Sequence, residues 1–119
     1  MAAEAYYQAG EPDLAAKRLT TVRQRAAIPG HKDEMVVASS DVNIDFILDE
    51  RARELVGEYK RWMDLKRTGK LIERTLAHNN LAARENKMDE HILVRPIPQS
   101  VIDQTEGEIS QNDKFLIII

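Results

Sequence analysis

Apolar residues recur at the spacing of an α-helix over much of this sequence. In the stretch 12–26 they are separated by 4, 3 and 4 positions, which places them on one face of a helix. The members of this stripe are Ala15, Leu19, Val22 and Ala26. The first ten residues are mostly good helix formers, and Gly10 supplies a stop between the two segments. The pattern therefore predicts a helical hairpin at the start of the chain.

The most regular pattern runs from Ile44 to about Thr68. Six apolar positions there are separated by 4, 4, 3, 4 and 3 residues, which predicts one face of a single long amphipathic helix. They are Ile44, Leu48, Ala52, Leu55, Tyr59 and Trp62. We therefore expect Tyr59 and Trp62 in the core, with an exposed aromatic platform as the alternative. Gly57 costs about 1 kcal/mol relative to Ala inside a helix, so close packing is its expected reason.

The other segments are shorter and are divided by turn-forming residues. A loop with one extended piece is expected over 29–40, and a short helix from Leu71 to Leu76, after Gly69 and before Asn79-Asn80. Pro98 begins a second short helix through Asp103, and irregular structure follows. The prediction is an all-α single domain over 1–119: a helical hairpin, a long amphipathic helix and an irregular tail that contains prolines.

Composition excludes several classes of protein. The 119 residues carry 17 Lys and Arg against 20 Asp and Glu, a net charge of −3, and contain no Cys. Disulfides, thiolate metal sites, a thiol nucleophile and a lipobox cysteine are therefore excluded within these residues. No apolar run approaches the ~20 residues of a membrane span, and the start does not resemble a signal peptide. Taken by itself, the sequence predicts a cytoplasmic chain.

Charge is concentrated in the middle of the sequence. Residues 50–74 hold 8 cationic and 5 anionic side chains, a balance of +3, whereas the segments on either side are each −3. Within this stretch opposite charges stand 3 or 4 positions apart, beside the apolar face of the predicted helix. Asp64 can meet Lys60 and Arg67. Two interpretations stay open, a solvated face and a partly buried structural network consisting of Arg51, Glu54, Glu58, Arg61, Trp62, Asp64 and Arg67.

The sequence carries no pattern typical of an enzyme or a metal site. His31, His78 and His91 lie in separate segments without ligand spacing, and no phosphate-binding loop accompanies the five glycines. A carboxylate metal helix would need Glu-x-x-His partners, which are absent. We therefore expect no catalytic residue, no metal and no cofactor.

Several ordered motifs together resemble a known family. The run Asp45 to Arg67 contains, in order, Glu50-Arg51, Glu54-Leu55, Glu58, Arg61-Trp62, Asp64-Leu65 and Arg67. This order resembles the signature near the C-terminus of the SusD/RagB family, roughly ERxxEL, a glutamate, then RWxDLxR. The helical hairpin at the start is also similar to the family's.

The tail resembles the same family. It contains Ile92-Leu93, then Pro96-Ile97-Pro98, and later Gln111-Asn112, similar to the family's L-x-P-I-P-x-x-E-I passage and closing Q-N-P-G-Y. Val101 departs from the usual acidic residue, and Asp113-Lys114-Phe115 replaces Pro-Gly-Tyr.

The resemblance implies the C-terminal segment of a tetratricopeptide-like α fold. SusD-like proteins are cell-surface lipoproteins of the outer membrane of Bacteroidetes, which capture glycans or other nutrients with a SusC-like TonB-dependent transporter. The resemblance implies a fragment of such a protein, carries over no ligand-binding residue, and implies neither catalysis nor nucleic-acid binding.

Alternatives from other classes remain open. They are a free-standing helical protein-interaction module and a helix-turn-helix regulator that uses the cationic stretch Lys60 to Arg74, and the family resemblance disfavours the regulator. If the chain normally packs on further helices, its uncovered apolar stripes predict self-association of the isolated fragment into a homo-oligomer.

Overall fold

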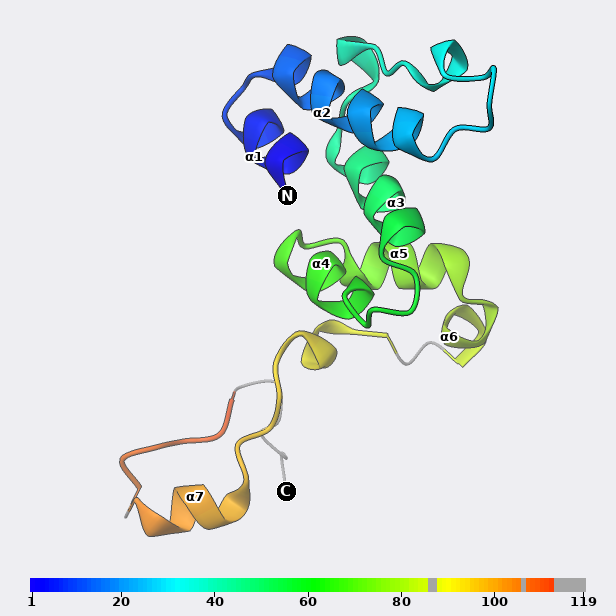
Figure 1. Cartoon of the computed structure of the whole chain (residues 1–119). Helices are drawn as coiled ribbons and strands as arrows, with labels where there is room; N and C mark the ends of the chain where they lie inside the picture. The colour runs from blue at the N-terminus through cyan, green and yellow to red at the C-terminus, as the bar shows by residue number, and fades with distance from the viewer. Residues whose placement is uncertain (86–87, 106, 113–119) are drawn as a thin grey trace. The chain divides into compact units, whose positions relative to one another are not determined.

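The computed structural model describes residues 1–85, 88–105 and 107–112. Over these residues the chain is helical and has no strand, which confirms the predicted all-α class (Figure 1). The chain divides into two compact units, residues 1–64 and 65–119, and each is described by itself. A single domain over the whole chain stays a prediction.

The first unit begins with the predicted helical hairpin. Helix α1 (Ala2–Gln8) and helix α2 (Pro12–Arg25) pack on each other. Gly10 between them has a φ of +77°, a left-handed conformation that glycine adopts without a steric penalty. The predicted stripe of α2 is only partly confirmed, because its last two members, Val22 and Ala26, are exposed.

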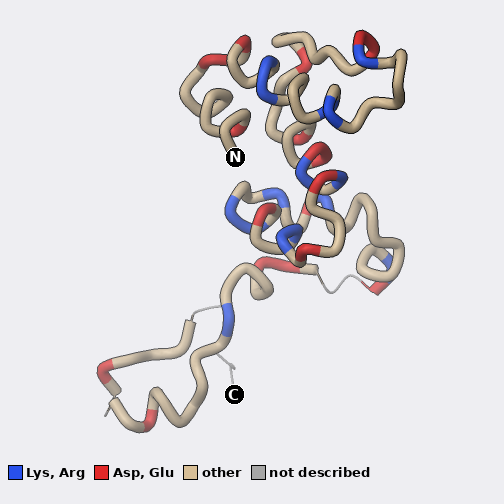
Figure 2. The backbone as a smooth tube through the Cα atoms, viewed as in Figure 1, with Lys and Arg blue, Asp and Glu red and all other residues tan. Residues whose placement is uncertain are grey.

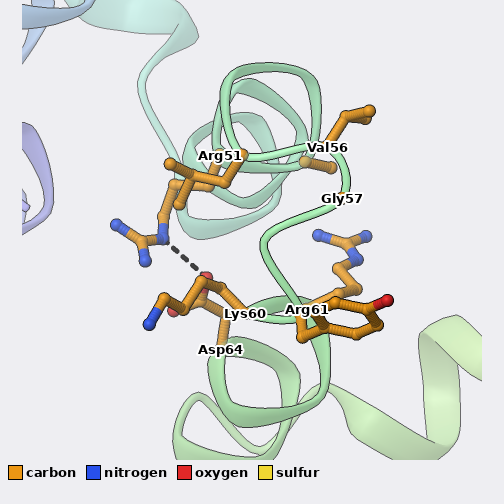
Figure 3. A pocket seen from close by; sticks show the side chains of 9 residues that line it. Arg51, Val56, Gly57, Lys60, Arg61 and Asp64 are labelled. Carbon is orange, nitrogen blue, oxygen red and sulfur yellow. Dashed lines mark hydrogen bonds and ion pairs between the residues drawn. The ribbon is translucent and has the colours of Figure 1, made fainter.

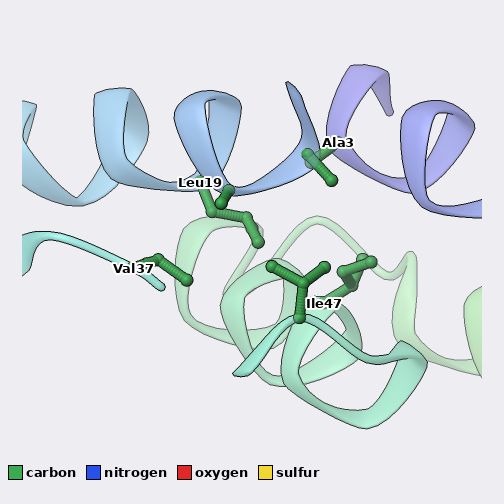
Figure 4. Packing of buried hydrophobic residues seen from close by; sticks show 7 residues of the cluster. Ala3, Leu19, Val37 and Ile47 are labelled. Atoms are coloured by element: carbon green, nitrogen blue, oxygen red, sulfur yellow. The ribbon is translucent and has the colours of Figure 1, made fainter. Parts of the chain in front are cut away.

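A small apolar core joins this hairpin to helix α3 (Ile44–Glu54). Asn43 caps α3, since its side chain accepts a hydrogen bond of 2.8 Å from the backbone N–H of Phe46. The buried cluster contains Ala3, Ala15, Ala16, Leu19, Val37, Val42 and Ile47. Figure 4 shows members from α1, α2, the connecting loop and α3 facing one another.

The loop between α2 and α3 contains two short 3₁₀ helices, η1 (Asp33–Met35) and η2 (Ser39–Asp41). Val37 lies between them, and its backbone N–H donates to Oγ1 of Thr20, 3.0 Å away. This bond fixes the loop to α2, so that Val37 is buried in the core.

The predicted long helix is wrong. Helix α3 ends at Glu54, and a separate helix α4 (Arg61–Arg67) follows after a turn. The turn contains two left-handed residues, Gly57 with φ +82° and Tyr59 with φ +56°. A Cβ added at Gly57 would meet nothing within 4 Å, so the glycine serves the backbone conformation and the close-packing explanation is also wrong.

The break changes where the aromatic side chains lie. Tyr59 is 95% exposed and Trp62 is 45% exposed, so the expectation that both lie in the core is wrong. A straight helix would have kept both residues on the face of Leu48, but the left-handed turn ends that register.

The second unit contains two short helices directly after Gly69, of which the sequence predicted the first but not the second. They are α5 (Leu71–His78) and α6 (Asn80–Glu85), which pack on each other. Asn79 forms the predicted break, because its side-chain oxygen accepts from the backbone N–H groups of Leu81 and Ala82 at 3.0 and 3.1 Å.

The proline-containing tail comprises η3 (Glu90–Leu93) and the predicted short helix, observed as α7 (Gln99–Gln104). The side-chain amide of Gln111 makes two hydrogen bonds with the backbone of Ile97, accepting from its N–H at 2.8 Å and donating to its C=O at 2.9 Å. The side chain of Gln111 thus satisfies both backbone polar groups of Ile97, whose neighbours Pro96 and Pro98 lack N–H donors. The departures at 113–119 lie outside the described residues.

Candidate binding site at the turn between α3 and α4

The turn after α3 brings together charged residues that are far apart in the sequence. Nε of Arg51 lies 2.8 Å from Oδ2 of Asp64, although the two residues are 13 positions apart. A straight helix would separate them by about 20 Å along its axis. The left-handed residues Gly57 and Tyr59 are therefore required for this ion pair to form.

The Arg51–Asp64 pair is largely removed from water. The two side chains are only 16% and 7% exposed. Burying a charged side chain costs folding free energy unless it is paired and hydrogen-bonded. Each of the two charges therefore offsets the cost of burying the other. The pair fastens the end of α3 to the beginning of α4.

Arg61 makes a second connection across the same turn. Its Nη1 donates to the backbone oxygen of Leu48 at 2.8 Å, again over 13 residues, and Leu48 is fully buried. Acidic and basic residues lie in short groups along α3 and the turn after it (Figure 2). The charged strip predicted along one helix is therefore observed as connections between two helices.

The other predicted members of the strip lie in different surroundings. Glu54 pairs with Arg25 of α2, and Trp62 and Arg67 are exposed on α4. Glu58 is exposed in the turn, and its side chain makes no hydrogen bond or ion pair with any residue that the structure describes. The place of Glu58 in the predicted network depended on a continuous helix, which the turn replaces.

The sequence analysis missed the position of Glu50. This carboxylate is buried, and its Oε1 lies 2.8 Å from Nη1 of Arg23 on α2, while Arg53 on α3 also pairs with it. The guanidinium of Arg23 also lies over the ring of Phe46, 5.6 Å from its centroid. The only signal in the sequence was the place of Glu50 in the ERxxEL run, because its partner lies 27 residues away.

A hollow of about 330 Å³ opens at this turn. Four charged side chains line it, three cationic and one anionic, together with apolar and aromatic groups of the turn (Figure 3). Its lining residues are Arg51, Ala52, Leu55, Val56, Gly57, Tyr59, Lys60, Arg61 and Asp64. A left-handed conformation in a residue as bulky as tyrosine costs about 1–3 kcal/mol, and such strain is concentrated at functional sites.

A second hollow, of about 580 Å³, lies on the same unit between α1, α2 and α3. We call it the apolar groove, and its floor includes Ala3, Leu19, Val22 and Ile47. Glu54 and Glu58 line its edge, and Arg51 and Lys60 border both hollows.

The described residues form neither a metal site nor a membrane-spanning helix. No group of three or more His, Cys, Asp or Glu side chains there is placed to hold a metal ion. His31 and His91 instead lie against neighbouring carboxylates, those of Glu34 and Asp89. None of the helices in the described ranges has the length and apolar character that crossing a membrane requires.

Comparison with known proteins places these motifs in a family. The model of the SusD family matches residues 1–115. Over 76 residues the chain is 38% identical to SusD-like protein P38 of Formosa agariphila, a match that covers 60% of this chain but 15% of that protein. No solved structure matches. The chain belongs to the SusD family, and it spans a small part of the length of the curated relative that it matches.

Proposed function

We propose that this chain is the C-terminal scaffold of a SusD-like lipoprotein, which captures a glycan or another nutrient at the cell surface. In this proposal the whole protein is held on the outer membrane and acts with a SusC-like TonB-dependent transporter. The observation that supports the proposal most directly is the family match over residues 1–115, with the signature motif intact.

The role of scaffold follows from what the motif residues do. Arg51 and Asp64 pair with each other, Arg61 bonds the backbone of Leu48, and Glu50 ties α3 to α2. These side chains hold helices in place. The motif that identifies the family therefore supports a fixed arrangement of α2, α3 and the beginning of α4, on which exposed turns are presented.

The proposal is tested by isolating the gene product from cells that make it naturally. With an affinity tag on the chromosomal gene, we expect a TonB-dependent transporter to co-purify from detergent-solubilised outer membranes. A tagged unrelated lipoprotein of the same membrane is the control. The proposal would be contradicted if the product is recovered without any transporter. This result counts only when the same measurement detects the partners of the control lipoprotein.

A free-standing helical interaction module is the alternative, and the apolar groove is the observation that favours it. Amphipathic helices bind to hydrophobic grooves through residues at i, i+3 and i+7. The same purification separates the two functions, because an interaction module would be recovered with a soluble partner and no transporter.

A further inference from the structure

We propose that the hollow at the α3–α4 turn binds an acidic saccharide. Arg51 and Lys60 would hold the carboxylate or sulfate group, and the ring of Tyr59 would pack against the sugar. The saccharide part of this inference rests on the function proposed above. The acidic part rests on the charges and geometry of the hollow.

Arg51 lines the hollow with a positioned fork, although its side chain is only 16% exposed. Its Nε is used by the buried Asp64, which fixes the plane of the guanidinium. Its two Nη atoms make no hydrogen bond with any described residue, and neither is a fully buried atom. Figure 3 shows the guanidinium of Arg51 beside Asp64, with the dashed line joining the two side chains. A planar fork whose two terminal NH₂ groups have no partner among the described residues matches the geometry of a carboxylate or sulfate.

Lys60 adds a second cation on the same side. Figure 3 shows Arg51 and Lys60 extending from the turn in the same direction. Lys60 is exposed, and its ammonium makes no ion pair with any residue that the structure describes. With Arg61 and Asp64, the lining carries three positive charges and one negative charge, a balance of +2 in a chain whose net charge is −3. Glu54 and Glu58 line the apolar groove and not this hollow.

Tyr59 supplies the surface for a sugar ring. Its left-handed backbone leaves the side chain 95% exposed at the edge of the hollow, where a core aromatic was expected. Sugar rings present C–H faces that pack on aromatic rings, while their hydroxyl groups need polar partners. A volume of about 330 Å³ is at the small end of ligand sites, which suits one or two sugar units.

The test measures saccharide binding to the 119-residue chain by titration calorimetry. The probes are trigalacturonate, a galactose trisaccharide bearing sulfate, and uncharged galactotriose. We expect the acidic probes to bind and galactotriose to bind at least about tenfold more weakly, because a charge-assisted hydrogen bond is lost. Binding of one acidic probe and not the other would support the proposal and identify the anion.

Matched variants locate the site. Lys60→Gln should weaken binding of the preferred acidic probe about tenfold, whereas Lys17→Gln, the same change at an exposed residue of α2 outside this hollow, should leave it unchanged. Tyr59→Gly keeps the left-handed backbone, and it should weaken binding of the acidic probe by a similar factor. Helical circular dichroism checks that each variant is folded.

Two results would overturn the inference. They are equal binding of galactotriose and the acidic probes, and acidic binding that Lys60→Gln and Lys17→Gln reduce equally. Absence of binding by any probe would overturn it as well. None of these results bears on co-purification with a transporter, so failure of this inference is distinguishable from failure of the proposed function.

Discussion

Asp64→Ala removes the acidic partner of the connection across the turn. Arg51 would then keep its charge at a position where its side chain is only 16% exposed. Breaking a buried ion pair by removing one partner costs about 3–5 kcal/mol, and the remaining exposure of Arg51 lowers the expected loss to about 2–4 kcal/mol. The expected result is a marked loss of stability from a single carboxylate, without any change in the apolar core.

Urea unfolding followed by tryptophan fluorescence measures this loss. The chain has one tryptophan, Trp62, which lies on α4 two residues before Asp64 and reports on this part of the fold. Glu73→Ala is the control, because it breaks an exposed pair with Lys70 and should cost less than about 0.5 kcal/mol. The double variant Arg51→Met, Asp64→Leu should recover most of this loss, since the charge of Arg51 is removed together with its partner. A loss below about 1 kcal/mol for Asp64→Ala would refute the reasoning.

The remaining predictions concern four other positions. Glu58→Ala should change the free energy of unfolding by less than about 0.5 kcal/mol in the same urea titration, because its side chain is exposed and unpaired within the described residues. Gly57→Ala should cost about 1–2 kcal/mol, since alanine disfavours the φ of +82°; an unchanged urea midpoint would contradict this. Leu19→Ala should cost about 2–5 kcal/mol by opening a cavity in the core, as thermal melting would show, whereas a change below 1 kcal/mol would contradict the packing described. Gln111→Ala should speed hydrogen exchange of the Ile97 amide by removing its acceptor, and an unchanged exchange rate would contradict the pairing.

Local patterns were sufficient to predict most helices but not the path of the chain between them. The hairpin, the stop at Gly69 and the break at Asn79-Asn80 depend on nearby residues, and all three are confirmed. The long helix was wrong because the apolar spacing continues through the turn without interruption. Gly57 was the available signal, because a glycine inside a helical pattern disfavours the helix by about 1 kcal/mol relative to Ala.

The candidate site was less predictable because its contacts are distant in sequence. Arg51 and Asp64 both stood in the predicted network, but their pairing over 13 residues requires the turn. The partner of Glu50 lies 27 residues away, and no local pattern encodes it. Tyr59 was expected in a core from its spacing alone, and only its left-handed backbone reveals an exposed ring. Motifs of the family thus identified the important residues, while the geometry defined what they do.

In the proposed function, this chain belongs to a nutrient-capturing protein on the cell surface. The most direct measurement adds a protease to intact cells that carry the tagged chromosomal gene and follows the tag by immunoblotting. A periplasmic protein and a cytoplasmic protein serve as controls that must survive. The account predicts that the tagged product is digested while both controls remain whole. Survival of the product in intact cells, followed by digestion only after lysis, would contradict the claim.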